Sequence, residues 1–426
     1  MVRDQLIRRS PVSQKLKMGL IMQGILVDGI LRPPYPDDVK KAPKIREITS
    51  RALIEVATSD NLSREVFGLL GVPVDALDLT TLLSKIDSAV GNGAPFFVST
   101  PNVNHLIASR ANEEFRESYL LSDVCPVDGM PIVWIARLLG IPIKTRLAGS
   151  DLFDTLKARS QTGRRMRVFL FGGSEGVAAR VGEMLNTQAG SMECVGSLNP
   201  GFGSVEEMST DEIIEKINSS GADLLVVFMA AKKAQQWLRL NHDRLKIPVR
   251  ANFGATINFQ VGKFKRAPIY LQRMGFEWLW RVKEEPYLWR RYWNDGGKLL
   301  FVVLTCAVPL ALGAQWRRLT TIRKVEGLQI DHSEDQRTIT IGLTGSAIAR
   351  QVDKAISYFR VALKEKKEIL IDLSKTRVVD PRFFGLFLMV RKQLLSQGNG
   401  LKFTGVTPRI KRIFRLNGFE FLLHSE

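Results

Sequence analysis

The sequence is poor in the residues that build disulfide frameworks and metal sites. Its 426 residues include 3 cysteines and 4 histidines, with no CxxC pair and no histidine cluster beside a cysteine. This spacing excludes a disulfide-rich secreted scaffold and the usual zinc sites. We expect Cys125, Cys194 and Cys306 to be buried small apolar groups in a reducing compartment.

Internal repeats and low-complexity tracts are also missing, and we expect no secretory signal. The apolar stretch at residues 20–30 contains Gln23 and Asp28 and has no small-residue cleavage site. Hydrophobic residues make up 45% and charged residues 24% of the chain, which is the balance of a folded protein and excludes extensive disorder.

Positive charge is in excess. The chain has 61 Lys and Arg against 43 Asp and Glu, a formal net charge of +18. Such a charge predicts an anionic partner, which could be nucleic acid, acidic lipid headgroups or phosphorylated substrates. No helix-turn-helix, zinc-finger or RNP-type motif accompanies it, so we expect no specific nucleic-acid binding.

The hydrophobic pattern predicts two α/β units. Residues 1–65, with a Pro-rich break at 32–36, are expected to be a partly disordered leader. From 66 to 298, strand-length apolar runs alternate with helix-length amphipathic runs, as in a Rossmann-like parallel-sheet domain. A smaller α/β unit follows at 325–426. We expect strands at 95–100, 167–172, 223–229, 248–253, 338–343, 368–373 and 401–404, and helices at 104–121, 176–185, 351–366, 384–397 and 408–417.

Between these units the composition changes. Residues 262–298 form a basic and aromatic appendage, and five of the seven tryptophans lie in or just after it. Residues 299–314 are nearly uncharged, but this run of about 16 residues is shorter than the roughly 20 needed to span a bilayer. We expect an interfacial, re-entrant or core helix, within a membrane-proximal linker at 299–324.

Polar residues at strand ends are the first candidate site residues. Thr100 and Asn102 follow the first strand, where open α/β sheets bind ligands, although Asn102 is also typical of a plain helix cap. Asp128 stands in a glycine turn and is either a turn former or a general base, if it reaches a substrate hydroxyl. Arg146 could pair with phosphate, and Asp151 is interpreted as a helix cap.

Gly172 and Gly173 follow a strand and open a helix, a geometry that can hold a diphosphate on backbone amides. The surrounding sequence is not GxGxxG and lacks an acidic ribose-binding residue, so a dinucleotide site is not indicated. No DxD pair ends a strand, which disfavours a metal-dependent sugar-nucleotide site. The four histidines have no triad partners and are interpreted as structural or surface residues.

These motifs together resemble one family. Residues 66 to about 294 are similar to the bacterial WecG, TagA and CpsF glycosyltransferases, which include N-acetylmannosamine-type transferases. The matching features run in the family's order: Thr100-Pro-Asn102, Asp128-Gly129, Arg146 to Asp151, Gly172-Gly173, Gly254-Ala255, Gly262 to Pro268, Glu277-Trp278 and Glu285-Pro286 with Arg290-Arg291-Tyr292.

The resemblance implies an inverting, metal-independent and cofactor-free transfer from a UDP-sugar to a polyprenyl-diphosphate-linked saccharide, in exopolysaccharide or surface polysaccharide biosynthesis. Asp128 would be the general base, Thr100 and Asn102 would line the sugar and acceptor pocket, and Arg146 would hold donor phosphate. The appendage would close over the site at an anionic membrane on the inner face of the plasma membrane, and self-association is consistent with the family. Other implied binding residues are Gly172, Gly173, Lys233, Gln235, Arg266, Arg281, Arg290 and Arg291.

The chain departs from the family after its third strand. The usual Pro-Lys-Gln-Glu motif reads Lys232-Lys233-Ala234-Gln235, so the motif lysine is kept and the glutamate is replaced. This change leaves an alternative open, in which a catalytically degenerate transferase domain serves as a scaffold or regulator.

The second unit resembles STAS domains. The support is the run Ile369 to Ser374, the helix start at Val379-Asp380 and the stretch from Gly398 to Gly405. Switchable members carry Asp-Ser-Ser-Gly at that helix start, whereas this chain reads Asp380-Pro381-Arg382-Phe383. A phosphorylation switch is therefore not expected there, and docking of a protein partner is the role that the resemblance leaves.

Overall fold

The computed structural model describes residues 61–159, 163–254, 256–260, 262, 266–320 and 327–424, together with the backbone of 25–27 and 30–32. Residues 1–52 group as one compact unit and 53–426 as another. In the first unit, β1 (Ile25–Val27) and β2 (Ile30–Arg32) pair antiparallel. The rest of the predicted leader up to residue 60 lies outside the described residues.

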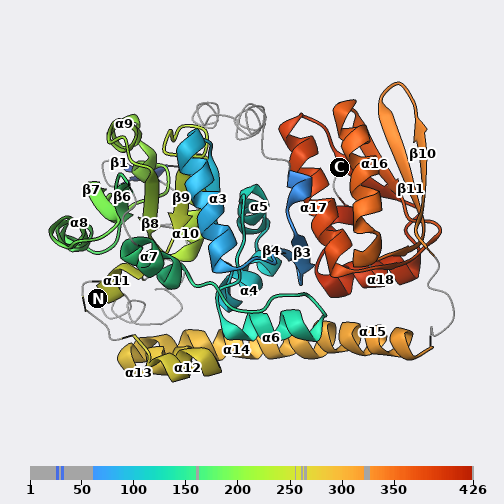
Figure 1. Ribbon diagram of the computed structural model, residues 1–426, viewed down its shortest axis with the longest axis horizontal. Coiled ribbons are helices and arrows are strands. Elements are labelled where there is room, and N and C mark those ends of the chain that lie inside the picture. Colours follow the sequence, from blue (N-terminus) through green and yellow to red (C-terminus); the bar gives the residue numbers. More distant parts are fainter. Residues whose placement is uncertain are drawn as a thin grey trace, which may run out of the picture. The chain divides into compact units, whose positions relative to one another are not determined.

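A five-stranded parallel sheet forms the core of the larger α/β region at 61–320; a parallel sheet was predicted, but its strand at 192–198 was not. Its order is β5-β9-β8-β6-β7, and all of its pairings are parallel. Strands β5, β6, β8 and β9 are largely buried because helices cover both faces of the sheet (Figure 1), whereas the edge strand β7 is only partly buried. The strands are β5 (Phe96–Val98), β6 (Met166–Gly172), β7 (Met192–Leu198), β8 (Leu224–Phe228) and β9 (Val249–Asn252).

Alternate residues of each strand face opposite helix layers. On one face, Val168 and Val226 pack against α3 (Leu79–Asn92), α7 (Gly149–Ala158) and α8 (Val177–Thr187). On the other, Phe169 and Val227 pack against α9 (Asp211–Ser219) and α10 (Ala231–Leu240). The five-residue helix α11 (Thr256–Gln260) follows β9.

The region before and after β5 differs from the prediction in two places. The predicted helix at 104–121 is two helices, α4 (Val103–Ala111) and α5 (Glu113–Leu121), because the Asn112 side chain ends one and caps the other by accepting from the Phe115 amide at 2.7 Å. The end of the predicted leader is also ordered: a 3₁₀ turn (Asn61–Ser63) buries Leu62, and the hairpin of β3 (Val66–Leu69) and β4 (Val72–Asp75) follows it.

Helix α6 (Met130–Leu138) follows the turn at Gly129. Much later in the chain, residues 269–320 are almost entirely helical and include one long helix. Short helices α12 (Ile269–Met274) and α13 (Glu277–Glu284) lead into a 3₁₀ turn (Pro286–Leu288) and α14 (Trp289–Val302), which continues through a π-helical segment (Val303–Ala307) into α15 (Val308–Thr320). The predicted boundary at residue 298 therefore lies inside a helix.

This helix is longer than the apolar run suggested. Between Pro286 and Arg317 it is 32 residues long and apolar enough, by length and composition, to cross a membrane. One side packs on the larger α/β region through Val302, Cys306 and Ala307. The other side exposes large apolar side chains, so the helix has one packed side and one apolar side that faces solvent. Residues 321–326 of the predicted linker lie outside the described residues.

The C-terminal unit is a smaller α/β fold, as predicted. Its sheet has the order β10-β11-β12-β14 with β13 paired to β11, and only the β10–β11 pairing is antiparallel. The strands are β10 (Gln329–Glu334), β11 (Thr338–Ala347), β12 (Glu368–Asp372), β13 (Thr376–Val379) and β14 (Leu401–Thr404), and the helices are α16 (Val352–Lys364), α17 (Pro381–Ser396) and α18 (Pro408–Asn417).

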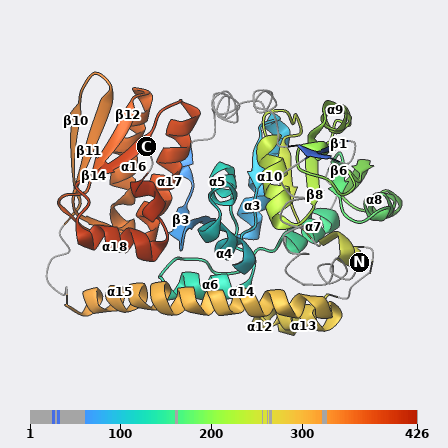
Figure 2. The same ribbon diagram turned by 180° about the vertical axis from the view of Figure 1, so that it is seen from behind.

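The two regions share a core. Helix α17 lies against β3 in both views (Figure 1 and Figure 2), and Leu62, Val66 and Leu120 belong to the same buried cluster as the C-terminal unit. The approach is close enough to require glycine, since a Cβ on Gly385 would lie 1.9 Å from the Val66 carbonyl oxygen. The C-terminal unit is therefore packed against the larger α/β region along this helix.

Candidate active site

Asp128 stands at the end of an extended segment that lies beside β5. Val124 pairs with Val98, the Ser99 amide donates to the Val124 carbonyl at 3.0 Å, and the Asp128 amide donates to the Pro101 carbonyl at 2.9 Å. These bonds place Asp128 at the carboxyl end of β5, where ligands of open α/β sheets bind. Gly129, with φ of 112°, then turns the chain into α6, a backbone conformation that favours glycine.

Thr100 and Asn102 lie at the same strand end. Thr100 is buried, and Asn102 caps α4 by accepting from the His105 amide at 3.2 Å. The helix-cap alternative is thus realised for Asn102. His105 is buried, its Nδ1 lies 2.6 Å from the Tyr119 hydroxyl, and burial, with the charge of Arg291, lowers its pKa to about 4.

Two arginines and three acidic residues form what we name the arginine cluster. Arg146 pairs with Glu277 and lies 3.8 Å from Asp151, while Arg266 pairs with Asp151. Arg266 also reaches Asp154 at 3.1 Å and Glu277 at 3.7 Å. All five side chains keep some exposure to solvent, between 14% and 44%.

The interpretation of Asp151 as a helix cap was wrong. Helix α7 has Ala148 at its cap position and no side-chain cap, and Asp151 lies in the first turn. Its carboxylate pairs with Arg146 and Arg266 instead, because two guanidinium groups attract a carboxylate more strongly than a backbone amide does.

Burial, with the charges of the arginine cluster as a smaller cause, sets the electrostatics of Asp128. Burial raises the pKa of this half-buried carboxyl to about 7; Arg146 and Arg281 oppose the shift, and Glu277 and Asp151 add to it. Arg281 itself pairs with Glu285 at 3.2 Å. A carboxyl that titrates near neutral pH is suited to take a proton and release it again, which is the task of a general base.

The glycines at the end of β6 have the predicted turn geometry. Gly172 and Gly173 have φ of 95° and 87°, and the Gly173 amide donates to the Phe228 carbonyl at 2.8 Å. A Cβ on Gly172 would lie 3.0 Å from that carbonyl oxygen. The turn stands three strand positions from β5 on the same edge of the sheet, about 14 Å away at usual strand spacing.

The other predicted binding residues do not belong to the arginine cluster. Lys233 donates to the Gly203 carbonyl, and Gln235 is buried with its Nε2 2.9 Å from the Ser99 hydroxyl. Arg290 and Arg291 are exposed in the first turn of α14, over the rings of Trp289 and Tyr292.

Sequence reasoning missed two partners of Arg146. Glu277 was recognised as part of a motif but given no role, and Gln272, whose Oε1 accepts from Arg146 at 3.2 Å, was not noticed. The signal that the sequence offered for Glu277 was an acidic residue inside a basic stretch. Within the ranges that the structure describes, no group of three or more His, Cys, Asp or Glu residues is placed to hold a metal ion.

Residues 67–311 match the sequence model of the Glycosyl transferase WecG/TagA/CpsF family. The chain belongs to this family. It is therefore a glycosyltransferase, and the predicted family and enzyme class are confirmed. Residues 330–424 match the model described as Mlab, STAS domain, which confirms the second resemblance.

A curated relative gives the family match a specific comparison. The chain is 25% identical, over 225 residues, to the N-acetylglucosaminyldiphosphoundecaprenol N-acetyl-beta-D-mannosaminyltransferase of Bacillus spizizenii. The alignment covers 51% of this chain and 85% of the relative. It includes too few residues to extend over the C-terminal unit as well as the transferase region.

Proposed function

We propose that this glycosyltransferase moves a sugar from a UDP-sugar to a polyprenyl-diphosphate-linked saccharide, with inversion and without a metal ion. The observation that carries the proposal is Asp128, a carboxyl with a pKa of about 7 beside paired arginines at the carboxyl end of the sheet. The name of the Bacillus relative, which describes transfer to a diphosphoundecaprenol-linked sugar, supports the substrate class. The setting would be assembly of a bacterial exopolysaccharide or surface polysaccharide.

In the proposed reaction Asp128 takes the proton of the acceptor hydroxyl as that oxygen attacks the anomeric carbon of the donor sugar. The bond between the anomeric carbon and the diphosphate oxygen breaks, and its electron pair leaves with UDP. A single displacement from the side opposite the leaving group inverts the configuration. The carboxylate form of Asp128 is required, so the reaction needs a pH near or above 7.

The arginine cluster would stabilise the leaving diphosphate. Without a ligand, Arg146 and Arg266 are neutralised by Glu277, Asp151 and Asp154. A diphosphate offers guanidinium groups stronger, bidentate acceptors than these partly exposed carboxylates. Preorganised arginines of this kind can supply the charge stabilisation that a metal ion supplies in other transferases.

We further propose that the exposed side of the long helix rests on the membrane surface at the inner face of the plasma membrane, since the acceptor is a lipid. Trp293 is 78% and Phe301 67% exposed, and basic residues Arg290 and Arg291 lie in the same helix. Tryptophan with arginine suits the headgroup region of an anionic bilayer. The other exposed apolar residues of the helix are Trp289, Leu300, Leu304, Leu312, Trp316 and Leu319.

The test is UDP release by the purified chain against a panel of UDP-sugars, with and without a polyprenyl-diphosphate-linked saccharide. Acceptor-dependent release with one donor would establish the reaction and identify the sugar. No release from any donor, with folded protein and lipid present, would contradict the proposal and favour a scaffold that acts through its STAS domain.

A further inference from the structure

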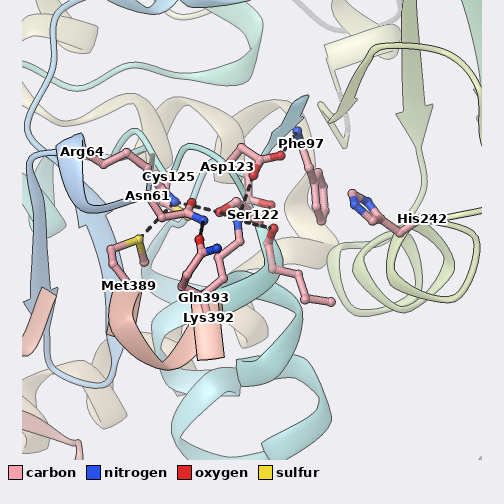
Figure 3. A network of polar contacts seen from close by, with 12 residues as sticks. Asn61, Arg64, Phe97, Ser122, Asp123, Cys125, His242, Met389, Lys392 and Gln393 are labelled. Carbon is pink, nitrogen blue, oxygen red and sulfur yellow. Dashed lines mark hydrogen bonds and ion pairs between the residues drawn. The ribbon is translucent and has the colours of Figure 1, made fainter. Parts of the chain in front are cut away.

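Four charged residues are buried together where the C-terminal unit meets the transferase region. Arg64, Asp75, Asp123 and Lys392 are each exposed by less than a tenth, and they carry two positive and two negative charges. Figure 3 shows Arg64, Asp123 and Lys392 with their polar contacts. Buried charges are tolerated only when they are paired and hydrogen-bonded. We name these four residues the interface network.

Lys392 comes from α17 of the C-terminal unit. Its Nζ pairs with Asp123 Oδ1 at 2.8 Å and donates to the carbonyls of Leu121 and Ser122 at 2.9 and 3.1 Å. These carbonyls stand at the end of α5, where a cation interacts favourably with unsatisfied groups. All three bonds of the ammonium group therefore go to the transferase region.

Arg64 and Asp75 form the second ion pair of the interface network. The Arg64 guanidinium binds both carboxylate oxygens of Asp75, at 2.8 and 3.2 Å, and donates to the Ser122 carbonyl at 3.1 Å. Asp75 in turn accepts from the Cys125 amide at 2.6 Å. The pair is fixed from the side of α17 as well, because Arg64 also contacts the Met389 sulfur.

The interface network continues into the strand that carries the candidate site. Asp123 Oδ2 accepts from the Phe97 amide of β5 at 2.8 Å. The Ser122 hydroxyl lies 2.7 Å from the Ser99 hydroxyl, which also accepts from Gln235. One end of the segment 122–128 is thus bonded to Lys392 and to β5, and its other end is Asp128.

We propose that Lys392 of the C-terminal unit is a positioning residue for sugar transfer: through Asp123 it fixes β5 and the segment that ends at Asp128. The proposal rests on the proposed function. It assigns the STAS-like unit a partner within its own chain, since the α17 residues that face outward from its core bind the transferase region. It also explains Gln235, which supports the Ser99 end of this network.

The main experiment compares Lys392→Met with Arg391→Met in the full chain. Arg391 is the preceding residue of α17 and also forms an ion pair across the interface, with Glu117 at 2.8 Å, but its partner lies in α5 and has no bond to β5. We expect Lys392→Met to lower kcat about tenfold or more, as misplaced groups do. The KM for the UDP-sugar should change less than twofold, and Arg391→Met should leave both constants near wild type.

Two further variants separate positioning from general stability. Lys392→Met leaves the Asp123 carboxylate buried without its cation, which destabilises the fold. In the double variant Lys392→Met with Asp123→Asn no unpaired charge remains, so the urea midpoint should recover while kcat stays low. Lys392→Arg keeps the cation and should restore part of kcat. Recovery of kcat together with stability in the double variant would overturn the proposal.

A readout without turnover keeps this test independent of the proposed function. Hydrogen exchange of the amides of Phe97, Ser99 and Cys125 reports the bonds of β5 and the 122–128 segment directly. Exchange should be faster in Lys392→Met and unchanged in Arg391→Met, even if no UDP-sugar is turned over. Equal protection in both variants would overturn the proposal, whereas faster exchange with no wild-type turnover would contradict the proposed function alone.

Discussion

The interface network and the arginine cluster use the same kinds of residue in different surroundings. In the first, Arg64, Asp75, Asp123 and Lys392 are sealed from water. In the second, Arg146 and Arg266 pair with carboxylates that are up to 44% exposed. Sealed charges cannot change partners without leaving a charge unpaired, whereas exposed ones can exchange a carboxylate for a ligand.

This difference teaches how to tell structural from ligand-binding charge in the same fold. Removing a residue from the interface network should cost stability, and at Lys392 it should also lower turnover through the displaced β5 and 122–128 segment. Removing a residue from the arginine cluster should lower turnover with little change in stability. The following experiments either break that distinction or sharpen it.

The largest effect is expected at Asp128. Asp128→Asn should lower kcat about 10²- to 10⁴-fold, because a general base contributes that much and the amide cannot take a proton. Acceptor-dependent UDP release measures it. The control is Asp87→Asn, which removes a surface carboxylate paired with Arg159 and should leave kcat unchanged. Wild-type turnover in Asp128→Asn would contradict the assignment of Asp128 as the general base.

In the interface network, Arg64→Met should destabilise the fold by about 3–5 kcal/mol, the usual cost of breaking a buried ion pair from one side. Urea unfolding followed by tryptophan fluorescence measures it. Arg159→Met, in a more exposed pair with Asp87, should change stability by less than about 1 kcal/mol. A small loss of stability in Arg64→Met would mean that the interface network is not shielded from water.

In the arginine cluster, Arg146→Met should lower kcat by roughly 10- to 100-fold. The urea midpoint should change little, because the carboxylates that lose Arg146 keep some contact with water. Steady-state kinetics and unfolding on the same preparation check both parts. A large loss of stability with normal turnover would reverse the comparison and make the cluster structural.

The pKa of Asp128 gives a pH dependence with a defined sign. Since this pKa is raised to about 7, kcat/KM should rise as the pH rises through about 7 and then level. The same shift lowers stability as the pH rises from the ordinary carboxyl range to 7, because the folded protein must lose a proton from a buried group. Asp128→Asn should therefore be more stable than wild type at pH 8, and this advantage should shrink towards pH 4.

The smallest effect is expected at the membrane side of the long helix. Phe301→Ser removes a side chain that is 67% exposed and should weaken flotation with anionic liposomes roughly tenfold, as one buried aromatic contributes about that much. Phe202→Ser is the matched control, because Phe202 is fully exposed in the loop after β7. Equal flotation of both variants would exclude this side of the helix from membrane binding.

What the sequence revealed depended on how local each feature is. Four strands of the central sheet were predictable because each is a short apolar run, whereas β7, which mixes polar and apolar residues, was missed. Asp128 and Arg146 were chosen as candidates because they stand in motifs of the family. The break at Asn112 was missed, although its side chain caps the next helix over only three residues. In this case a continuous amphipathic pattern outweighed a single capping residue.

Partners far apart in the chain were not predictable. The pairing of Arg146 with Glu277 joins residues 131 positions apart, and Gln235 lies 136 positions from Ser99. Nothing in the pattern around Gln235 distinguishes a buried support from a donor-binding group. Burial of Arg64 was hidden for the same reason, since the helix that covers it comes more than 300 residues later.

The contact between β3 and α17 also sets an order of events during synthesis. The carbonyl of Val66 receives its bond from Arg382, 316 residues further along the chain. A ribosome exposes β3 long before it has made the helix that covers it, so the hairpin and the end of α5 must wait with apolar residues uncovered. A chain that ended before α17 would lose more than its STAS-like unit, because β3 and the end of α5 would stay uncovered.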